Sequence, residues 1–327
     1  MSVHSSRTAE ALALISEDMR AVDAVVSERL SSDVAMVSQV SRYIISAGGK
    51  RLRPALLLLM CGALEFRGTQ RYNLAAVVEF IHTATLLHDD VVDGSTLRRG
   101  RATANEAFGN PASVLVGDFL YSRAFQMMVD AGDMRIMQTL AEATNVIAEG
   151  EVLQLMNMHD ASLSEEGYLR VIRSKTAKLF EASARLAALL AKAPAETERH
   201  CAQYGQALGT AFQVIDDVLD YDGDAAEMGK NLGDDLREGK ATLPLIIAMQ
   251  RGTDDERLLI RRAIETGGDA QIDEVMLIVR RTGALEATRA AAASEAQRAL
   301  DSLQYLPDNT YSGALRQLAS QLLLRRA

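Results

Sequence analysis

Residues 80–101 read FIHTATLLHDDVVDGSTLRRGR. The segment begins as an apolar helix and ends with three aspartates and three arginines. Asp89 and Asp93 are four positions apart, so on a helix their side chains share one face, and Asp90 points about 100° away from Asp89. Carboxylates on one face repel one another unless a cation lies between them. Oxygen ligands of this kind suit a hard divalent cation, and Mg²⁺ usually completes its coordination with water and substrate phosphate.

A solvated acidic helix end is the simpler interpretation of this segment taken alone. Residues 212–220, however, read FQVIDDVLD, so Asp216, Asp217 and Asp220 repeat the spacing behind another apolar run. Two unrelated acidic helix ends explain this repetition poorly. If the two helices pack side by side, the clusters face each other across one cavity mouth and form a cage for metal ions and a polyanionic group.

The composition favours helices throughout the chain. It has 327 residues, 48% of them hydrophobic, and no tryptophan, and its abundant alanine and leucine are strong helix formers. We find no strand-like alternation bounded by turn signals, and prolines fall only at expected helix starts or in links, at positions 54, 111, 194, 244 and 307. We therefore predict one all-α domain, spanning residues 1–327, whose core helices are apolar nearly all round.

Charge and apolar runs exclude several classes of protein. The net charge of −9 argues against a nucleic-acid partner, because no broad basic surface is expected. The longest apolar run, residues 55–61, is too short for a transmembrane segment, and the N-terminus lacks the apolar core of a signal peptide. Cys61 and Cys201 lie in apolar helical segments, so we expect reduced core thiols and a cytoplasmic protein.

Capping residues and early prolines predict where individual helices begin. We expect starts at Asn73, at Asn110 and at Thr242, the last two with a proline close behind. Ser164 should cap one long helix that runs through Leu190.

Three further motifs accompany the aspartates: GGKRLRP at residues 48–54, RRG at 98–100 and GKATLP at 239–244. Together with both DDxxD motifs they resemble the trans-polyprenyl diphosphate synthases, over essentially the whole chain. The segments EFIHTATLLHDDVVD and VIAEGEVLQLMN are most similar to the long-chain bacterial members. The resemblance implies an isoprenoid synthase-type helical bundle around a deep central cavity, and a homodimer.

Members of this family join an allylic diphosphate to isopentenyl diphosphate. The allylic C–O bond ionises to pyrophosphate and a carbocation, the alkene of isopentenyl diphosphate attacks, and a proton is lost to the released pyrophosphate. The resemblance implies that this chain elongates farnesyl or geranylgeranyl diphosphate to an all-trans octaprenyl product for a quinone side chain, with nonaprenyl or decaprenyl products as alternatives. A class I terpene cyclase and a non-catalytic synthase subunit are the competing hypotheses, and the intact KRLR segment and all six aspartates argue against them.

The resemblance also assigns residues to the metal ions and to both diphosphates. Three Mg²⁺ ions are implied at Asp89, Asp93 and Asp216, while Asp90, Asp217 and Asp220 act through water or through hydrogen bonds to the ligands. The allylic diphosphate is assigned to four cations, Arg98, Lys175, Lys230 and Lys240. The isopentenyl diphosphate is assigned to a metal-free set, Lys50, Arg53, His82 and Arg99.

Two side chains are implied to act on the carbocation. The oxygens of Thr176 and Gln213 would face it, with the catalytic lysines Lys175 and Lys240 nearby. Read from the residues alone, His82 is a core histidine and Gln213 an amide at the core edge, so only the resemblance gives them a role. The other histidines are interpreted as structural, namely His4, His88, His159 and His200.

Product length is expected to depend on the part of the helix that precedes the first motif. Ala84 is five residues before Asp89, about 7.5 Å down the helix. The resemblance implies that an aromatic residue near this position blocks the growing chain in short-product enzymes, whereas Ala84 and the aliphatic Ile81 leave the way open. The tail is then expected to pass towards residues 119–128 and 140–153, with Met127 and Met128 as candidates for the floor.

Overall fold

The computed structural model describes residues 11–46, 48–222, 232–268 and 271–324. These residues form helices and one short hairpin, and the chain divides into two compact units. The first unit is drawn from Met1–Thr144, Leu179–Gly205 and Ser302–Leu318, and the second from Asn145–Lys178, Gln206–Asp301 and Ala319–Ala327. The all-α prediction agrees with this architecture, and the prediction of a single domain stays a prediction.

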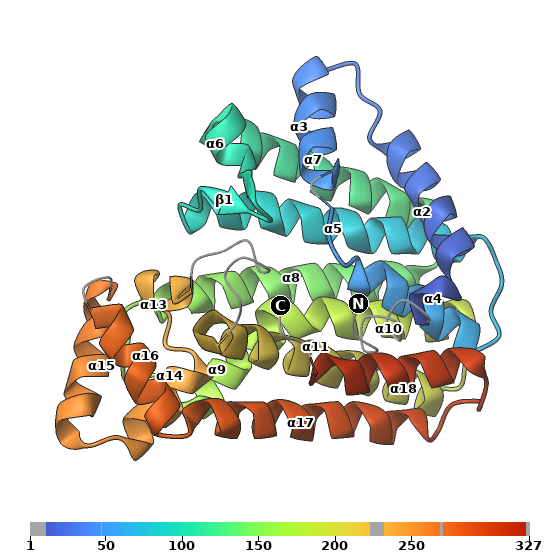
Figure 1. Ribbon diagram of the computed structural model, residues 1–327. Helices are drawn as coiled ribbons and strands as arrows, with labels where there is room; N and C mark the ends of the chain where they lie inside the picture. Colours follow the sequence, from blue (N-terminus) through green and yellow to red (C-terminus); the bar gives the residue numbers. More distant parts are fainter. Residues whose placement is uncertain (1–10, 47, 223–231, 269–270, 325–327) are drawn as a thin grey trace. The chain divides into compact units, whose positions relative to one another are not determined.

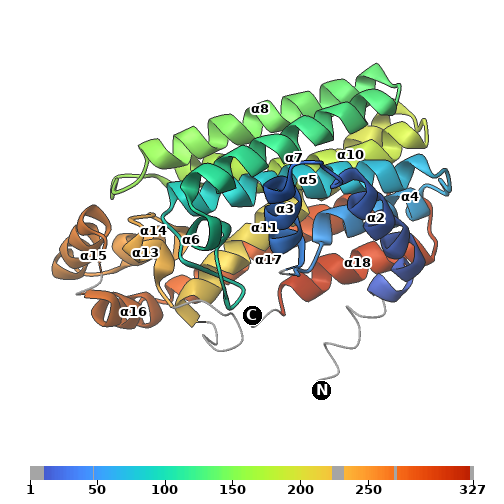
Figure 2. The same cartoon turned by 90° about the horizontal axis from the view of Figure 1, so that it is seen from above.

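The long helix α5 is the centre of the first unit. It packs along α7 and also contacts α4 and α2 (Figures 1 and 2). Residues 54–63 of α4 are all buried, so this helix is apolar on every side, as expected for a core helix. The helices of this unit are α2 (Ser16–Arg29), α3 (Ala35–Ser46), α4 (Leu52–Ala63), α5 (Gln70–Val92), α6 (Ala104–Phe108) and α7 (Asn110–Asp130).

A two-stranded hairpin follows α5 and corrects the prediction that no sheet is present. Its strands are β1 (Leu97–Arg98) and β2 (Arg101–Ala102), paired antiparallel. The two residues between them, Arg99 and Gly100, have φ values of 52° and 72°. Positive φ at both central residues is the mark of a type I′ turn, whose twist matches that of the flanking strands. Strands of two residues carry no alternation that a sequence pattern can show.

The second unit contains a break in a helix that the sequence predicts to be continuous. Ser164 caps the helix as expected, because its hydroxyl accepts a hydrogen bond from the backbone N–H of Gly167 at 3.1 Å. The helix does not run unbroken to Leu190: α9 (Glu165–Ile172) passes into a π-helical turn, η1 (Arg173–Ala177), before α10 (Lys178–Leu190). Such turns are rare and often occur at functional sites.

The rest of the second unit is also helical. α14 (Leu243–Arg251), α15 (Asp254–Thr266) and α16 (Ile272–Arg281) pack against one another (Figures 1 and 2), and α13 (Asp234–Arg237) precedes them. Several helices contribute residues to both units. These are α8 (Met134–Met156), α11 (Ala195–Asp222), α17 (Ala284–Leu303), α18 (Thr310–Leu322) and, through Lys178 alone in the second unit, α10.

Of the three predicted helix starts, those at Asn110 and Thr242 are confirmed, whereas the one at Asn73 is wrong. Asn73 lies inside α5, which begins at Gln70, and its amide instead donates to the backbone oxygen of Met127 on α7 at 3.0 Å. α7 begins at Asn110 as expected, although its N-cap is Gly109 rather than Asn110 itself. Thr242 is the N-cap of α14, with a proline in the first turn as expected.

The two cysteines are buried and not bonded to each other, in agreement with the prediction of core thiols. Burial raises the pKa of both thiols, to about 12 for Cys201. Among the described helices, none combines the length and apolar character needed to cross a membrane.

Candidate active site

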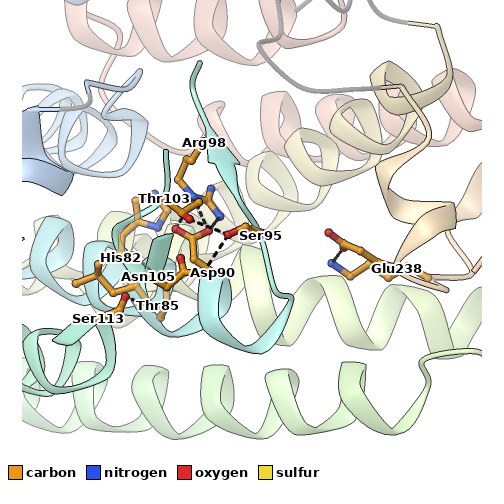
Figure 3. Close-up of polar contacts among 11 residues, drawn as sticks. His82, Thr85, Asp90, Ser95, Arg98, Thr103, Asn105, Ser113 and Glu238 are labelled. Atoms are coloured by element: carbon orange, nitrogen blue, oxygen red, sulfur yellow. Dashed lines mark hydrogen bonds and ion pairs between the residues drawn. The ribbon is translucent and has the colours of Figure 1, made fainter. Parts of the chain in front are cut away.

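The first aspartate motif lies at the C-terminal end of α5 and has one buried and two half-buried carboxylates. Asp90 is completely buried, whereas Asp89 and Asp93 are half-buried. Arg98 in β1 donates through Nε and Nη2 to both oxygens of Asp90, at 2.6–3.1 Å (Figure 3). Two-pronged pairs of this kind are strong because donor and acceptor are both charged. Asp90 is therefore held by the protein, on a different side of the helix from Asp89 and Asp93.

The loop after α5 fixes the position of Arg98. The backbone N–H of Ser95 donates to the backbone oxygen of Asp90 at 3.0 Å. The backbone oxygen of Ser95 in turn accepts from the hydroxyl of Thr103 at 2.7 Å and from the amide of Asn105 at 3.2 Å (Figure 3). Hydrogen bonds thus link the end of α5 to Ser95, before β1, and link Ser95 to residues that follow β2. A diphosphate that contacts Arg98, as predicted, would use the edge of the guanidinium away from Asp90.

Three of the four residues predicted to bind isopentenyl diphosphate lie together in the first unit. Arg53 Nη1 is 3.2 Å from His82 Nε2, and the Arg53 guanidinium lies over the Phe180 ring, 4.6 Å from its centroid. A Cβ added to Gly49 would come within 2.6 Å of the Arg99 guanidinium, so the chain before α4 touches the hairpin turn. Lys50, the fourth residue, follows Gly49 and is exposed.

Burial and the positive charges of this cluster disfavour protonation of His82. An arginine can only donate, so His82 Nε2 accepts from Arg53 and the ring proton resides on Nδ1. Burial lowers the pKa of His82 well below its usual value, and Arg53, Arg99 and Arg98 lower it further. Burial also lowers the pKa of Arg53 to about 10. The cluster gathers positive charge and donors where a diphosphate is predicted to bind.

Glu79 is a member of the cluster that the sequence interpretation did not include. Burial raises the pKa of this carboxyl, and Arg51, Arg53 and Arg99 oppose the shift. Arg51 Nε lies 4.0 Å from Glu79 Oε1, and Arg51 also pairs with Asp23. The sequence contained a feature that could have indicated this role, because Glu79 is a charged residue inside an apolar helix, three positions before His82.

The second aspartate motif, on α11, is held by different groups. The hydroxyl of Tyr168 donates to Asp217 Oδ2 at 2.5 Å, and Gln213 Nε2 donates to Asp217 Oδ1 at 2.8 Å. The hydroxyl of Thr176 donates to Gln213 Oε1 at 2.9 Å. Two residues predicted to face the carbocation are therefore bonded to each other and to the motif. Tyr168 had not been predicted as a site residue.

The second motif is crowded with negative charge. Burial raises the pKa of Asp217 well above its usual value, the charges of Asp235 and Asp216 add to the shift, and the hydrogen bonds from Tyr168 and Gln213 oppose it. Asp220 is buried and accepts the backbone N–H groups of Asp234 and Asp235, each at 3.2 Å. Asp216, by contrast, is half-buried.

Each described lysine of the allylic set lies beside a glutamate. Lys175, on the π-helical turn, has its Nζ 2.6 Å from Glu151 Oε2, and Lys240 pairs with Glu238 (Figure 3). Lys230 lies outside the described residues. Neither glutamate had been predicted as a partner, although Glu151 belongs to the segment VIAEGEVLQLMN, which resembles the long-chain enzymes.

His159 supports the segment that carries Lys240. Its backbone N–H donates to the backbone oxygen of Gly239 at 2.8 Å, and its ring Nδ1 lies 3.0 Å from the backbone oxygen of Ile264. A Cβ at position 239 would lie 2.3 Å from that ring, so the close approach needs glycine. This agrees with the structural role predicted for His159.

The residues predicted to set product length are buried. Ala84 and Ile81 on α5 have no exposed surface, and Met127 and Met128 on α7 have at most 1%. Burial is expected both for the wall of a tunnel and for tight packing between the two helices, so the assignment stays a prediction.

Comparisons with known proteins agree with these features. The polyprenyl synthetase family model matches residues 34–281. An octaprenyl diphosphate synthase of Escherichia coli (strain K12) is 53% identical over 307 residues, which cover 94% of this chain and 95% of that protein. The chain belongs to the polyprenyl synthetase family.

Two other relatives extend the comparison. An all-trans-nonaprenyl-diphosphate synthase (geranyl-diphosphate specific) of Rhodobacter capsulatus is 47% identical over 317 residues, covering 96% of this chain and 97% of that protein. The crystal structure of a polyprenyl synthase from Caulobacter crescentus CB15, complexed with calcium and isoprenyl diphosphate, superposes with a TM-score of 0.94 at 44% identity, covering 98% of both chains. The predicted family and fold class are confirmed.

The donor groups of both motifs fit a divalent cation. The aspartates predicted as metal ligands, Asp89, Asp93 and Asp216, are the half-buried members of their motifs, whereas the other three are buried and bonded to protein donors. Across residues 11–46, 48–222, 232–268 and 271–324, no three His, Cys, Asp or Glu side chains are grouped closely enough to bind a metal. Because Mg²⁺ is usually bound through one or two carboxylates plus water and substrate phosphate, the pair Asp89 and Asp93 is an adequate donor set.

Proposed function

We propose that this chain is a long-chain trans-prenyltransferase that condenses isopentenyl diphosphate repeatedly with farnesyl or geranylgeranyl diphosphate. The proposed product is all-trans-octaprenyl diphosphate, destined for a quinone side chain. The observation that carries this proposal is the contrast within each DDxxD motif, where the protein holds the second aspartate and the first aspartate remains half-buried. The identity of 53% to an octaprenyl diphosphate synthase supports the product length.

The mechanism assigns separate tasks to the two sets of cations. Lys50, Arg53, His82 and Arg99 bind the diphosphate of isopentenyl diphosphate, and the neutral His82 contributes its Nδ1 hydrogen as a donor. Lys175 and Lys240 bind the allylic diphosphate, together with Arg98 and Lys230. Bound Mg²⁺ ions, three per site by resemblance, would stabilise the negative charge that the leaving pyrophosphate gains.

The allylic diphosphate has to compete with ion pairs that are already formed. Lys175 contacts Glu151 and Lys240 contacts Glu238, so each ammonium group must turn from its carboxylate when the diphosphate binds. The oxygens of Thr176 and Gln213 then steady the carbocation. We further propose that the enzyme works as a homodimer in the cytoplasm.

The product formed from labelled isopentenyl diphosphate tests the proposal. The full chain is incubated with Mg²⁺ and geranyl, farnesyl or geranylgeranyl diphosphate, and the product length is measured by chromatography after phosphatase treatment. We expect a forty-carbon alcohol and no product in the presence of EDTA. Products of forty-five or fifty carbons would overturn the octaprenyl assignment alone. A hydrocarbon made from the allylic substrate without label would indicate a cyclase, and no turnover would indicate a non-catalytic subunit.

A pair of arginine variants tests the assignment of the isopentenyl diphosphate site. Arg53→Ala should raise the KM for isopentenyl diphosphate by about tenfold or more, because a charged hydrogen-bond donor to the diphosphate is lost. The KM for the allylic substrate should change little. Arg67→Ala is the matched control, because Arg67 also lies 4.6 Å over an aromatic ring, that of Tyr311, but belongs to no predicted site. Equal effects of Arg53→Ala on both substrates would contradict the assignment.

A further inference from the structure

A directed chain of hydrogen bonds runs through the second unit from Tyr168 to Thr176. Tyr168 donates to one oxygen of Asp217, Gln213 donates to the other, and Thr176 donates to Gln213. Every donor in this chain points towards Asp217. The four side chains come from α9, η1 and α11, so the chain connects the π-helical turn to the second aspartate motif.

The acceptor character of Asp217 determines the orientation of the next two groups. Both oxygens of Asp217 accept a hydrogen bond, so the Gln213 amide presents its nitrogen to Asp217 and its oxygen to Thr176. Thr176 then donates its single hydroxyl proton to Gln213 and keeps only lone pairs for any other neighbour. An oxygen with lone pairs directed outward is the group that a carbocation requires. The position of the buried Asp217 side chain therefore determines the orientation of the Gln213 amide and of the Thr176 hydroxyl.

Tyr168 anchors this chain. Its side chain and that of Asp217 are each only 3% exposed, so bulk water does not readily replace the tyrosine hydroxyl as a donor to Asp217 Oδ2. A buried carboxylate that loses a donor tends to reorient towards another one. Gln213 Nε2 is the nearest donor that Asp217 already uses, and its movement would release Thr176.

We propose that Tyr168 is a positioning residue for the condensation, which acts through Asp217 to direct the oxygens of Gln213 and Thr176. The inference rests on the proposed function, because it assumes that these oxygens steady a carbocation. It adds a residue that makes no contact with either substrate in the proposed mechanism. Removal of the hydroxyl should lower kcat and leave binding of isopentenyl diphosphate intact.

The experiment compares two tyrosine-to-phenylalanine variants of the full chain. Tyr168→Phe removes the hydroxyl and keeps the ring. Tyr204→Phe is the matched control, since Tyr204 is also fully buried and donates one hydrogen bond, at 2.8 Å, to the backbone oxygen of Leu315 in the first unit. We expect kcat to fall about tenfold in Tyr168→Phe, with the KM for isopentenyl diphosphate within about twofold of wild type. Tyr204→Phe should lose a similar amount of thermal stability and keep its kcat within about twofold.

A double-mutant cycle with Gln213→Leu identifies the route of the effect. If Tyr168 acts through Gln213, Tyr168→Phe should lower kcat by less than about twofold in the Gln213→Leu background, because the coupled step is already lost. Multiplicative losses in the double variant would overturn the inference, as would an unchanged kcat in Tyr168→Phe or equal losses in the two tyrosine variants. Wild-type protein that incorporates no labelled isopentenyl diphosphate would overturn the proposed function itself, so the two failures are distinguishable.

Discussion

The two aspartate motifs have the same spacing but different surroundings. In the first, Asp90 is bonded to Arg98, so a buried negative charge has a positive partner at 2.6 Å. In the second, Asp217 is bonded only to the neutral groups of Tyr168 and Gln213 among its described hydrogen bonds. The first motif thus has its own counter-charge, whereas burial and neighbouring carboxylates raise the pKa of Asp217 in the second.

The pattern of aspartates therefore identifies the chemistry of the two motifs but not their electrostatics. A dication that approaches the first motif meets carboxylates whose buried member is already neutralised by Arg98. One that approaches the second meets Asp216 and Asp235, whose negative charges add to the effect of burial in raising the pKa of Asp217. We expect cation binding to relieve more repulsion at the second motif than at the first.

The largest expected effect is the loss of a predicted metal ligand from either motif. Asp89→Ala and Asp216→Ala should each lower kcat by about a thousandfold or more, because the leaving pyrophosphate loses its charge stabilisation. Both variants should keep their helical content, which circular dichroism measures alongside turnover at saturating Mg²⁺. Near-normal turnover in either variant would contradict the hypothesis that both motifs bind metal.

A smaller effect on stability should separate the second aspartates. Asp90→Asn leaves Arg98 without its buried counter-charge and should lower the free energy of unfolding by about 3 kcal/mol. Asp217→Asn removes a carboxylate whose charged form burial already disfavours, so its stability should change by no more than about 1 kcal/mol. Urea titration of the variants without metal measures both values. Equal losses would mean that the counter-charge of the first motif has no consequence for stability.

The sequence predicted those features that depend on local periodicity. The helical angle predicts different faces for Asp89 and Asp90, and the structure has the first half-buried and the second buried. Ser164 caps its helix as its residue type suggests. The hairpin escaped prediction because its turn depends on Arg99 adopting a positive φ, which is uncommon for residues other than glycine.

Other features depend on partners that are distant in the sequence. Tyr168 and Asp217 are 49 positions apart, and nothing near either residue indicates the bond. Residues 173–177, which form the π-helical turn, look in the sequence like an ordinary helix surface. Asn73 looked like a cap because asparagine commonly caps helices, but its amide is used across to α7.

A third prediction compares equivalent positions before the two motifs. Ala84 is five residues before Asp89, and Ala211 is five residues before Asp216, and both alanines are fully buried. Ala84→Phe places a ring about a turn and a half below the first motif, so elongation should stop after one or two additions, at fifteen or twenty carbons from a short starter. The rate of isopentenyl diphosphate consumption should be retained.

Ala211→Phe is the matched control for this effect. Overpacking either position should lower stability by about 1–3 kcal/mol, but only the change at Ala84 should shorten the product. Product length and melting temperature are measured on the same preparations. Full-length product from Ala84→Phe would show that the tail does not pass this residue. Shortening by both variants would show that the loss of product length is not specific to α5.

The smallest expected effect is a pH dependence confined to the first region. Seven residues before Asp89 the chain has His82, whereas seven residues before Asp216 it has Gly209. The pKa of His82 is held below its usual value by burial and by Arg53, so the unfolded chain binds a proton more readily than the folded one when the pH falls below about 6.5. Stability from this group is therefore present at neutral pH and lost on acidification, by at most about 1.4 kcal/mol per pH unit.

His82→Gln, whose amide oxygen can still accept from Arg53, should lose less stability than wild type between pH 7.5 and pH 5.5. Melting temperatures at the two pH values measure the difference, and an identical pH dependence in both proteins would mean that His82 takes up its proton as easily in the folded chain as in the unfolded one.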